Sequence, residues 1–236
     1  MTVDARDIAG FYRSSLGALT AALLAQELGA IWPHMAGVSV LGVGHAVPCL
    51  AQWHAQARCL AVIPAHMQAS PWPESAPNLS CIAETDALPF ADLSFERVLL
   101  VHGLEQAGHA QRLLREVWRV LKDDGRLLTV VPNRRGLWAY VETTPFGHGQ
   151  PYSEGQLARL LTSLSFQVER QKTALYSPPF EAFAKPALFR LLEKCGPYLA
   201  PHFAGLVLAE ASKKMAGLVP ASGQVAARRV LVVNNL

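Results

Sequence analysis

The chain has 236 residues, of which 51% are hydrophobic and 17% are charged, and its formal net charge is +3. This length fits one α/β domain, and the apolar content permits a sizeable buried core and excludes intrinsic disorder. The net charge is too small to indicate nucleic-acid binding by itself, because proteins that bind nucleic acids usually carry a concentrated basic face. No run of about 18 apolar residues occurs, so the sequence predicts no membrane-spanning helix.

The cysteines and the first residues bear on the compartment. The four cysteines are Cys49, Cys59, Cys81 and Cys195. They form no CxxC pair and no Cys/His cluster with zinc spacing, so no metal site is predicted. Cys59 and Cys81 lie in apolar runs, where we expect small buried hydrophobes in a reducing compartment. Asp4 and Asp7 replace the basic start of a secretory signal, so we expect a cytoplasmic protein.

The first predicted element is a helix over residues 4–28, broken into two pieces. Leu16, Leu19 and Leu23 recur at helical spacing, which predicts one buried face. Gly29 is the expected end of this helix. Residues 1–30 are therefore expected to form an N-terminal helical cap.

A strand, a glycine turn and a helix are predicted next. Residues 38–41 form a short apolar run, Gly42-Val43-Gly44 follows at once, and Pro48 suits the first turn of a helix. Glycines let the backbone turn tightly and approach a ligand, and a helix start presents free N–H groups. Many sharp turns also contain two glycines, so a cofactor turn and a plain turn both stay open.

The rest of the chain alternates strands with helices. Strands are predicted at residues 58–63, 80–83, 97–101, 126–131, 166–169 and 205–211. Helices are predicted at residues 109–121, 153–164 and 180–194, and Asp123-Asp124-Gly125 is expected to turn the chain. Such alternation predicts a mainly parallel, doubly wound sheet, whose ligands bind at the carboxyl ends of the strands.

Residues 133–153 form a long segment rich in glycine, proline and aromatic residues, and we expect a lid over the ligand site. The Arg134–Arg135 pair can clamp an anion, and His148 between two glycines can act as a base. The alternative is a lid that only packs, held by Trp138 and Phe146.

Three motifs, taken in order, resemble a known family. They are Gly42-Val43-Gly44-His45-Ala46 after a strand, Asp86-Ala87-Leu88-Pro89-Phe90 before the fourth strand, and Leu114-Arg115-Glu116-Val117-Trp118-Arg119-Val120-Leu121-Lys122 followed by Gly125-Arg126-Leu127-Leu128. Their order and spacing are similar to the class I S-adenosylmethionine-dependent methyltransferases of the methyltransferase-11-like group. The resemblance covers Val38 to Val131 and continues weakly to the last predicted strand.

The resemblance implies an α/β fold: a Rossmann-like, seven-stranded, mainly parallel sheet with helices on both faces and an antiparallel last strand. It implies one methyltransferase-like domain over residues 1–214, including a helical insert at residues 173–204. Residues 215–236 would be a C-terminal tail without an assigned structure.

The cofactor implied by the resemblance is S-adenosylmethionine. The residues expected to bind it are Gly42, Gly44, His45, Ala46, Pro64, Asp86, Ala87, Leu88 and His102. The residues expected near the reacting methyl group are His102 and His148. The residues expected to bind the methyl acceptor are Tyr12, Arg13, Asn133, Arg134 and Arg135.

Two positions depart from the family. Val40 stands where an acidic residue is usual, and the second strand ends in Ala61–His66, which contains no Asp or Glu to bind the ribose hydroxyls. Each lost charged hydrogen bond costs about 1.5–3 kcal/mol. His66 or Gln68 could substitute for the missing acid.

The leading hypothesis is a methyltransferase of class EC 2.1.1.- that acts on a small molecule or a protein side chain. The rival is a catalytically inactive methyltransferase fold that serves as a binding or partner module. The missing acid at the end of the second strand favours the rival, whereas Asp86 and the glycine turn oppose it. An RNA methyltransferase would need a basic face that the sequence lacks.

Overall fold

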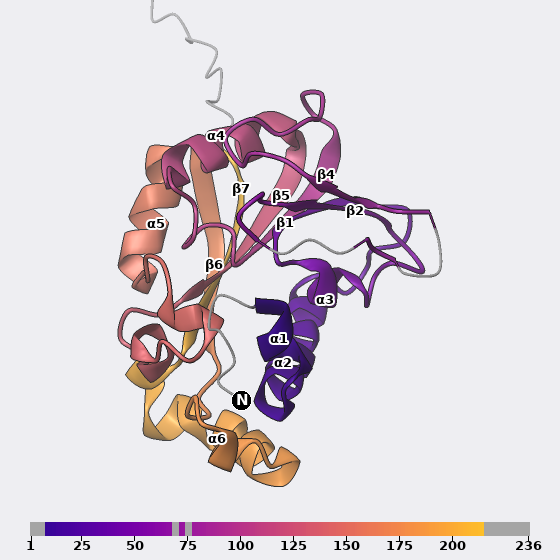
Figure 1. The fold of residues 1–236 in the computed structure, drawn as a ribbon. Helices are drawn as coiled ribbons and strands as arrows, with labels where there is room; N and C mark the ends of the chain where they lie inside the picture. Colours follow the sequence, from indigo (N-terminus) through magenta and orange to yellow (C-terminus); the bar gives the residue numbers. More distant parts are fainter. Residues whose placement is uncertain (1–7, 68–70, 74–76, 215–236) are drawn as a thin grey trace, which may run out of the picture.

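The computed structural model describes residues 8–67, 71–73 and 77–214. Its centre is a seven-stranded sheet in the order β3-β2-β1-β4-β5-β7-β6 (Figure 1). The strands are β1 (Ser39–Gly44), β2 (Arg58–Ile63), β3 (Ser80–Ile82), β4 (Phe95–Val101), β5 (Leu121–Pro132), β6 (Phe166–Ala174) and β7 (Leu206–Lys213). Strands β1 to β5 pair in parallel, whereas β7 runs antiparallel to both β5 and β6. The predicted Rossmann-like class and its antiparallel last strand are confirmed.

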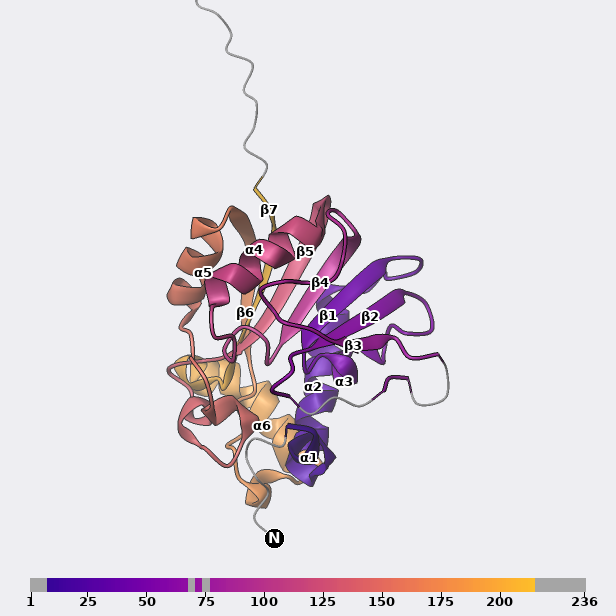
Figure 2. The ribbon, with the colours of Figure 1, turned by 45° about the horizontal axis from the view of Figure 1, so that its top comes forward.

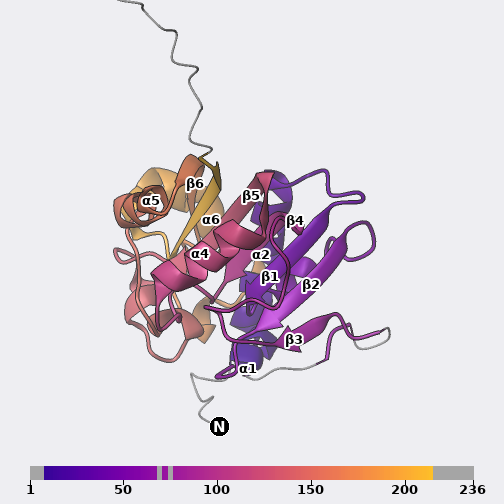
Figure 3. The same ribbon diagram turned by 90° about the horizontal axis from the view of Figure 1, so that it is seen from above.

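Helices cover both faces of the sheet, as Figures 2 and 3 show. The α-helices are α1 (Ile8–Arg13), α2 (Ser15–Ile31), α3 (Val47–Leu50), α4 (Ala110–Val120), α5 (Glu154–Ser163) and α6 (Pro186–Leu199). Short 3-10 helices are η1 (Leu137–Tyr140), η2 (Pro145–Gly147), η3 (Glu181–Phe183) and η4 (Pro201–Phe203). Helices α4 and α5 pack on one face, and α2, α3 and α6 contribute to the core on the other.

The two cores follow from the alternation of side chains along each strand. Val40 points into the core that contains Leu24 and Leu28 of α2. Its neighbour Leu41 points into the core that contains Leu113 of α4. Every residue of β1 is buried, which explains why this strand is apolar throughout rather than alternating with polar residues.

Several predicted boundaries are wrong. Gly29 does not end α2, which continues to Ile31 because Leu28 and Ile31 are buried against the sheet. Gly42–Gly44 belongs to β1, where it pairs with β2 and β4, so the bend comes only after Gly44. The fifth strand begins at Leu121 rather than Arg126, but its pairing with β4 jumps from Leu121 to Arg126, and Gly125 lies against Leu121 and Lys122, so the predicted turn at Asp123–Gly125 falls inside β5.

Other expectations have mixed outcomes. The two-piece N-terminal helix is confirmed from Ile8 onward, and Ser153 caps α5 through a capping box with Gln156. Cys59 is buried, but Cys81 is exposed because β3 is an edge strand, so its predicted burial is wrong.

Residues 1–7 and the predicted tail at 215–236 lie outside the described residues. Within the part of the chain that the structure describes, no helix combines the length and apolar character needed to cross a bilayer.

Candidate active site

His102 lies at the carboxyl edge of the sheet, directly after β4 ends at Val101. Its side chain is fully buried, and its backbone has φ of +54°, a left-handed conformation that is uncommon outside glycine. Backbone strain of this kind costs about 1–3 kcal/mol and clusters at functional sites. His102, which was expected near the reacting group, therefore sits in a position that the fold maintains at some cost.

A hydrogen-bond chain links α1 to the loop after β4. The Tyr12 hydroxyl lies 2.9 Å from Nε2 of His102, and Nδ1 of His102 lies 3.1 Å from Oε1 of Glu105. An ionised carboxylate can only accept, so the Nδ1–H of His102 donates to Glu105 and Nε2 is left to accept from Tyr12. The side chains of His102 and Glu105 are both 0% exposed, so water does not compete for these bonds.

Glu105 is a functional candidate that the sequence analysis missed. Its Oε2 atom is buried and has no hydrogen-bond partner among the described residues. A buried polar atom without a partner is rare and points to a functional role or to a further bound group. The available signal was the spacing of His102 and Glu105, three residues apart directly after the fourth strand.

Tyr12 also covers the segment after β1. Its ring stacks on His45, with ring centroids 5.3 Å apart and planes at 12°. Burial raises the pKa of the Tyr12 hydroxyl well above its usual value, and the nearby Cys49 and Glu105 raise it further. The hydroxyl therefore stays protonated at neutral pH and can donate to His102.

The glycines of β1 are required by close packing. A side chain at Gly42 would place its Cβ 2.6 Å from Cδ1 of Leu50. At Gly44, which has φ of +91°, a Cβ would lie 2.3 Å from the carbonyl oxygen of Val101. The space beside both glycines is therefore filled by protein atoms, which corrects the expected open bend. The backbone after Gly44 is held by the His45 N–H, which donates to the same Val101 oxygen at 2.7 Å.

The segment expected to face adenine is fixed by α4. Leu88 is buried, its N–H donates to Oε2 of Glu116 at 2.9 Å, and its carbonyl accepts from Nη2 of Arg119 at 2.9 Å. Asp86 is exposed, with Oδ2 3.5 Å from Nη1 of Arg112. Glu116 and Arg119, which belong to the third motif, thus hold the second motif in place.

The end of β2 offers no carboxylate. Pro64 is buried directly after the strand, Ala65 and His66 are exposed, and Gln68 lies outside the described residues. The departure noted in the sequence therefore concerns the strand end itself: the described residues 64–67, directly after β2, include no acid.

The lid, residues 133–153, packs on the hydrogen-bond chain through Phe146, whose ring centroid lies 4.5 Å from that of His102. Trp138 and Phe146 are buried, as the packing alternative requires. Nε2 of His148 donates to the carbonyl of Glu142 at 2.8 Å, so its contact lies within the lid and does not join it to His102.

The expected acceptor residues of the lid differ in their surroundings. The amide of Asn133 donates to the carbonyl of Ala204 at 2.8 Å and accepts from the N–H of Arg135 at 3.1 Å, so it serves the backbone. The side chains of Arg134 and Arg135 are exposed. Within the described ranges, no three metal-binding side chains converge on one point.

The comparisons with known proteins agree with the fold of the chain. Residues 40–129, from β1 into β5, match a family model described as a methyltransferase domain. This part of the chain is therefore similar to methyltransferase domains. The matched residues include Gly44, His102 and Glu105, but not Tyr12. No curated protein sequence matches the chain.

Solved structures share the fold of the methyltransferase domain at low identity. A SAM-dependent methyltransferase from Thermotoga maritima is 14% identical, with a TM-score of 0.59 over 91% of this chain and 100% of that chain. The 1,6-didemethyltoxoflavin-N1-methyltransferase of Burkholderia thailandensis, with bound S-adenosylhomocysteine, is 18% identical, with a TM-score of 0.54 over 90% and 83%. The [4+2]-cyclase SpnF is 18% identical, with a TM-score of 0.58 over 85% and 83%.

Proposed function

We propose that the chain transfers a methyl group from S-adenosylmethionine to a small molecule or a protein side chain. The observation that carries this proposal is the buried hydrogen-bond chain of Tyr12, His102 and Glu105 at the carboxyl ends of β1 and β4. Ligands of doubly wound sheets bind at this edge. A strained histidine beside a buried carboxylate lowers stability, and such arrangements are concentrated at functional sites.

The residues present fit the cofactor in part. When bound, S-adenosylmethionine supplies an electrophilic methyl group. In our proposal the backbone of Gly44–Ala46 holds its methionine end, with His102 behind Tyr12 on the same side, while Asp86–Leu88 face its adenine. Pro64–His66 offer no carboxylate to the ribose hydroxyls, so we expect weaker binding than in relatives that have the acid.

His102 is the proposed base. Methyl transfer requires in-line positioning, and it requires a base only where the nucleophile carries a proton. Glu105 is a positioning residue that fixes Nδ1 of His102 and stabilises the imidazolium. Because Nε2 already bonds to Tyr12, the proton of the acceptor reaches His102 through the Tyr12 hydroxyl. His148 stays a second candidate base that first has to leave its lid contact.

The acceptor remains a small molecule or a protein side chain. The residues proposed to bind it are Tyr12, Arg13, Asn133, Arg134 and Arg135. A cavity of about 320 Å³ lies between α1 and the lid, with Phe11 and Phe180 among its lining residues. Its apolar walls suit an apolar part of the acceptor, and the exposed Arg134 and Arg135 suit an acidic part.

We propose one domain over residues 1–214, because the described part of that range forms a single sheet with its covering helices. All four cysteines are free, which supports a reducing compartment such as the cytoplasm. If the methyl acceptor is a protein side chain, the protein that carries it is the partner of this chain.

Calorimetry with S-adenosylmethionine and S-adenosylhomocysteine tests the function. We expect a micromolar Kd that Asp86→Ala and His102→Gln each weaken by about tenfold. Asp124→Ala, which removes an exposed acid on β5, is the matched control and should leave the Kd unchanged. Substitution of Gly44 is unsuitable, because a side chain there collides with β4 whether or not a cofactor binds.

The second candidate function is a non-catalytic binding or partner module. Two observations favour it: Tyr12 covers His45, and the described residues 64–67, directly after β2, include no acid. SpnF, a cyclase on the same fold, illustrates that the fold alone does not fix the reaction. A folded protein that binds neither cofactor at millimolar concentration would contradict the first function and favour this second one.

A further inference from the structure

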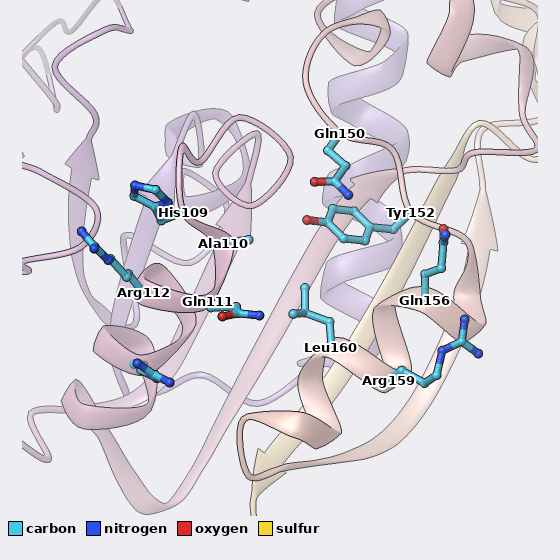
Figure 4. A pocket seen from close by; sticks show the side chains of 10 residues that line it. His109, Ala110, Gln111, Arg112, Gln150, Tyr152, Gln156, Arg159 and Leu160 are labelled. Atoms are coloured by element: carbon cyan, nitrogen blue, oxygen red, sulfur yellow. The ribbon is translucent and has the colours of Figure 1, made fainter.

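A groove of about 520 Å³ separates α4 from α5, and the methyl-transfer proposal does not use it (Figure 4). Its walls carry Arg112 and Arg115 from α4, Arg159 from α5, and three glutamines. None of the ten described residues that line it is acidic. The groove is therefore a concave surface with three positive charges and several amide donors.

The arginines of the groove have little counter-charge. Arg112 and Arg115 are three residues apart on one helix, and Figure 4 shows Arg112 and Arg159 on opposite walls. Among the residues that the structure describes, the carboxylate paired with Arg112 is the exposed Asp86 at 3.5 Å, and no ion pair involves Arg115 or Arg159. Figure 4 shows the Arg112 and Arg159 side chains directed away from each other, and their long flexible stems would let the guanidinium groups turn toward an anion in the groove.

We propose that this groove binds a small multivalent oxyanion, a phosphate or a carboxylate compound. The planar guanidinium group matches both of these oxyanions, to which it donates two parallel hydrogen bonds. Oε1 of Gln156 accepts from the N–H of Ser153, which leaves the NH₂ group of Gln156 to donate to a ligand. The volume lies within the roughly 300–1,000 Å³ that is usual for small-molecule sites.

A small ligand suits the groove better than a nucleic acid. The net charge of the whole chain is only +3, which gives little long-range attraction for a polyanion. The groove also lies beside the candidate active site, because its wall residue Gln150 donates its N–H to the carbonyl of Glu105 at 2.8 Å. The binding inference nevertheless stands whether or not the chain transfers methyl groups.

Calorimetric titration with inorganic pyrophosphate and with citrate tests the groove. At low salt we expect saturable binding of at least one probe, weakened about tenfold in the double variant Arg115→Gln/Arg159→Gln and reduced as salt screens the charges. Tighter binding of pyrophosphate would assign a phosphate ligand, and tighter binding of citrate would assign a carboxylate ligand. Either result supports the inference.

The control is Arg190→Gln, which removes an exposed arginine on α6, away from the groove. Circular dichroism of each variant would establish that it is folded. Three outcomes overturn the inference: no saturable binding of either probe up to about 10 mM, an equal loss in Arg190→Gln, or tighter binding of a single-stranded oligonucleotide through the same arginines. The last outcome would make the groove part of a nucleic-acid surface.

Discussion

His102 has partners from two separate parts of the chain. Tyr12 reaches its Nε2 from α1, 90 residues away, and Glu105 reaches its Nδ1 from three residues away. Glu105, the partner that is near in sequence, fixes the tautomer of the His102 imidazole. Tyr12, the partner that is distant in sequence, supplies the hydrogen bond to Nε2. A buried imidazole that has both partners is positioned, whereas one that has lost a partner keeps an unsatisfied polar atom.

Tyr12→Phe tests this arrangement. The change removes one oxygen and leaves Nε2 of the buried His102 unpaired, so we expect the free energy of unfolding to fall by about 1–3 kcal/mol. Urea denaturation measures the change. Tyr198→Phe, at a side chain that is 87% exposed, is the control and should change the stability by less than about 0.5 kcal/mol. Equal values for the two variants would contradict a structural bond between Tyr12 and His102.

At the level of elements, a carboxylate on β4 connects three neighbouring strands. Glu96 accepts hydrogen bonds from the N–H and hydroxyl of Ser39 on β1 and from Lys122 on β5. Burial alone would raise the pKa of Glu96, but these hydrogen bonds outweigh it and lower the pKa to about 2. The amino ends of the central strands are thus held by a group whose contribution depends on pH.

The Glu96 pKa predicts how stability depends on pH. Because the folded-state pKa lies below the value of 4.5 for a free glutamate, the carboxylate stabilises the fold above pH 4.5 and loses this effect as pH falls toward 2. Glu96→Gln should therefore be less stable than the wild type at pH 7, with the difference shrinking between these two pH values. Thermal unfolding across this range measures the difference, and a constant difference would contradict the assignment.

For the whole molecule, Glu210 links the N-terminal helices to the last strands. This buried residue of β7 accepts from Nε1 of Trp32 at 2.8 Å and from Nε of Arg170 on β6 at 2.7 Å. Arg170 also donates to the carbonyl of Ile31 at the end of α2 at 2.9 Å. These hydrogen bonds of Glu210 and Arg170 connect the end of α2 to β6 and β7.

Glu210→Leu tests this connection. The half-exposed Arg170 can turn to water, but the buried indole N–H of Trp32 cannot, so we expect a loss of about 2 kcal/mol in the free energy of unfolding. Urea denaturation followed by Trp fluorescence measures the loss. The control Glu142→Leu, at an exposed lid position, should change the stability little. A loss no larger than that of the control would refute the structural role of Glu210.

Local sequence patterns predicted most elements of the fold. The apolar run at residues 58–63 and the capping residue Ser153 lie where they were expected, because strand burial and helix capping depend on neighbours in sequence. The strand ends were less accurate: Gly42–Gly44 remains in β1 because two flanking strands supply its hydrogen-bond partners. Pairing of this kind involves distant residues and leaves little local signal.

The sequence by itself determined the alternating α/β class, the three motifs of the methyltransferase domain and the absence of an acid in Ala61–His66. Only the tertiary structure decided that Tyr12 reaches His102, that the space beside Gly42 and Gly44 is filled, and that arginines of α4 and α5 line one groove. The physical reason is that periodicity and capping act over a few residues, whereas a site is made by contacts between segments that folding brings together.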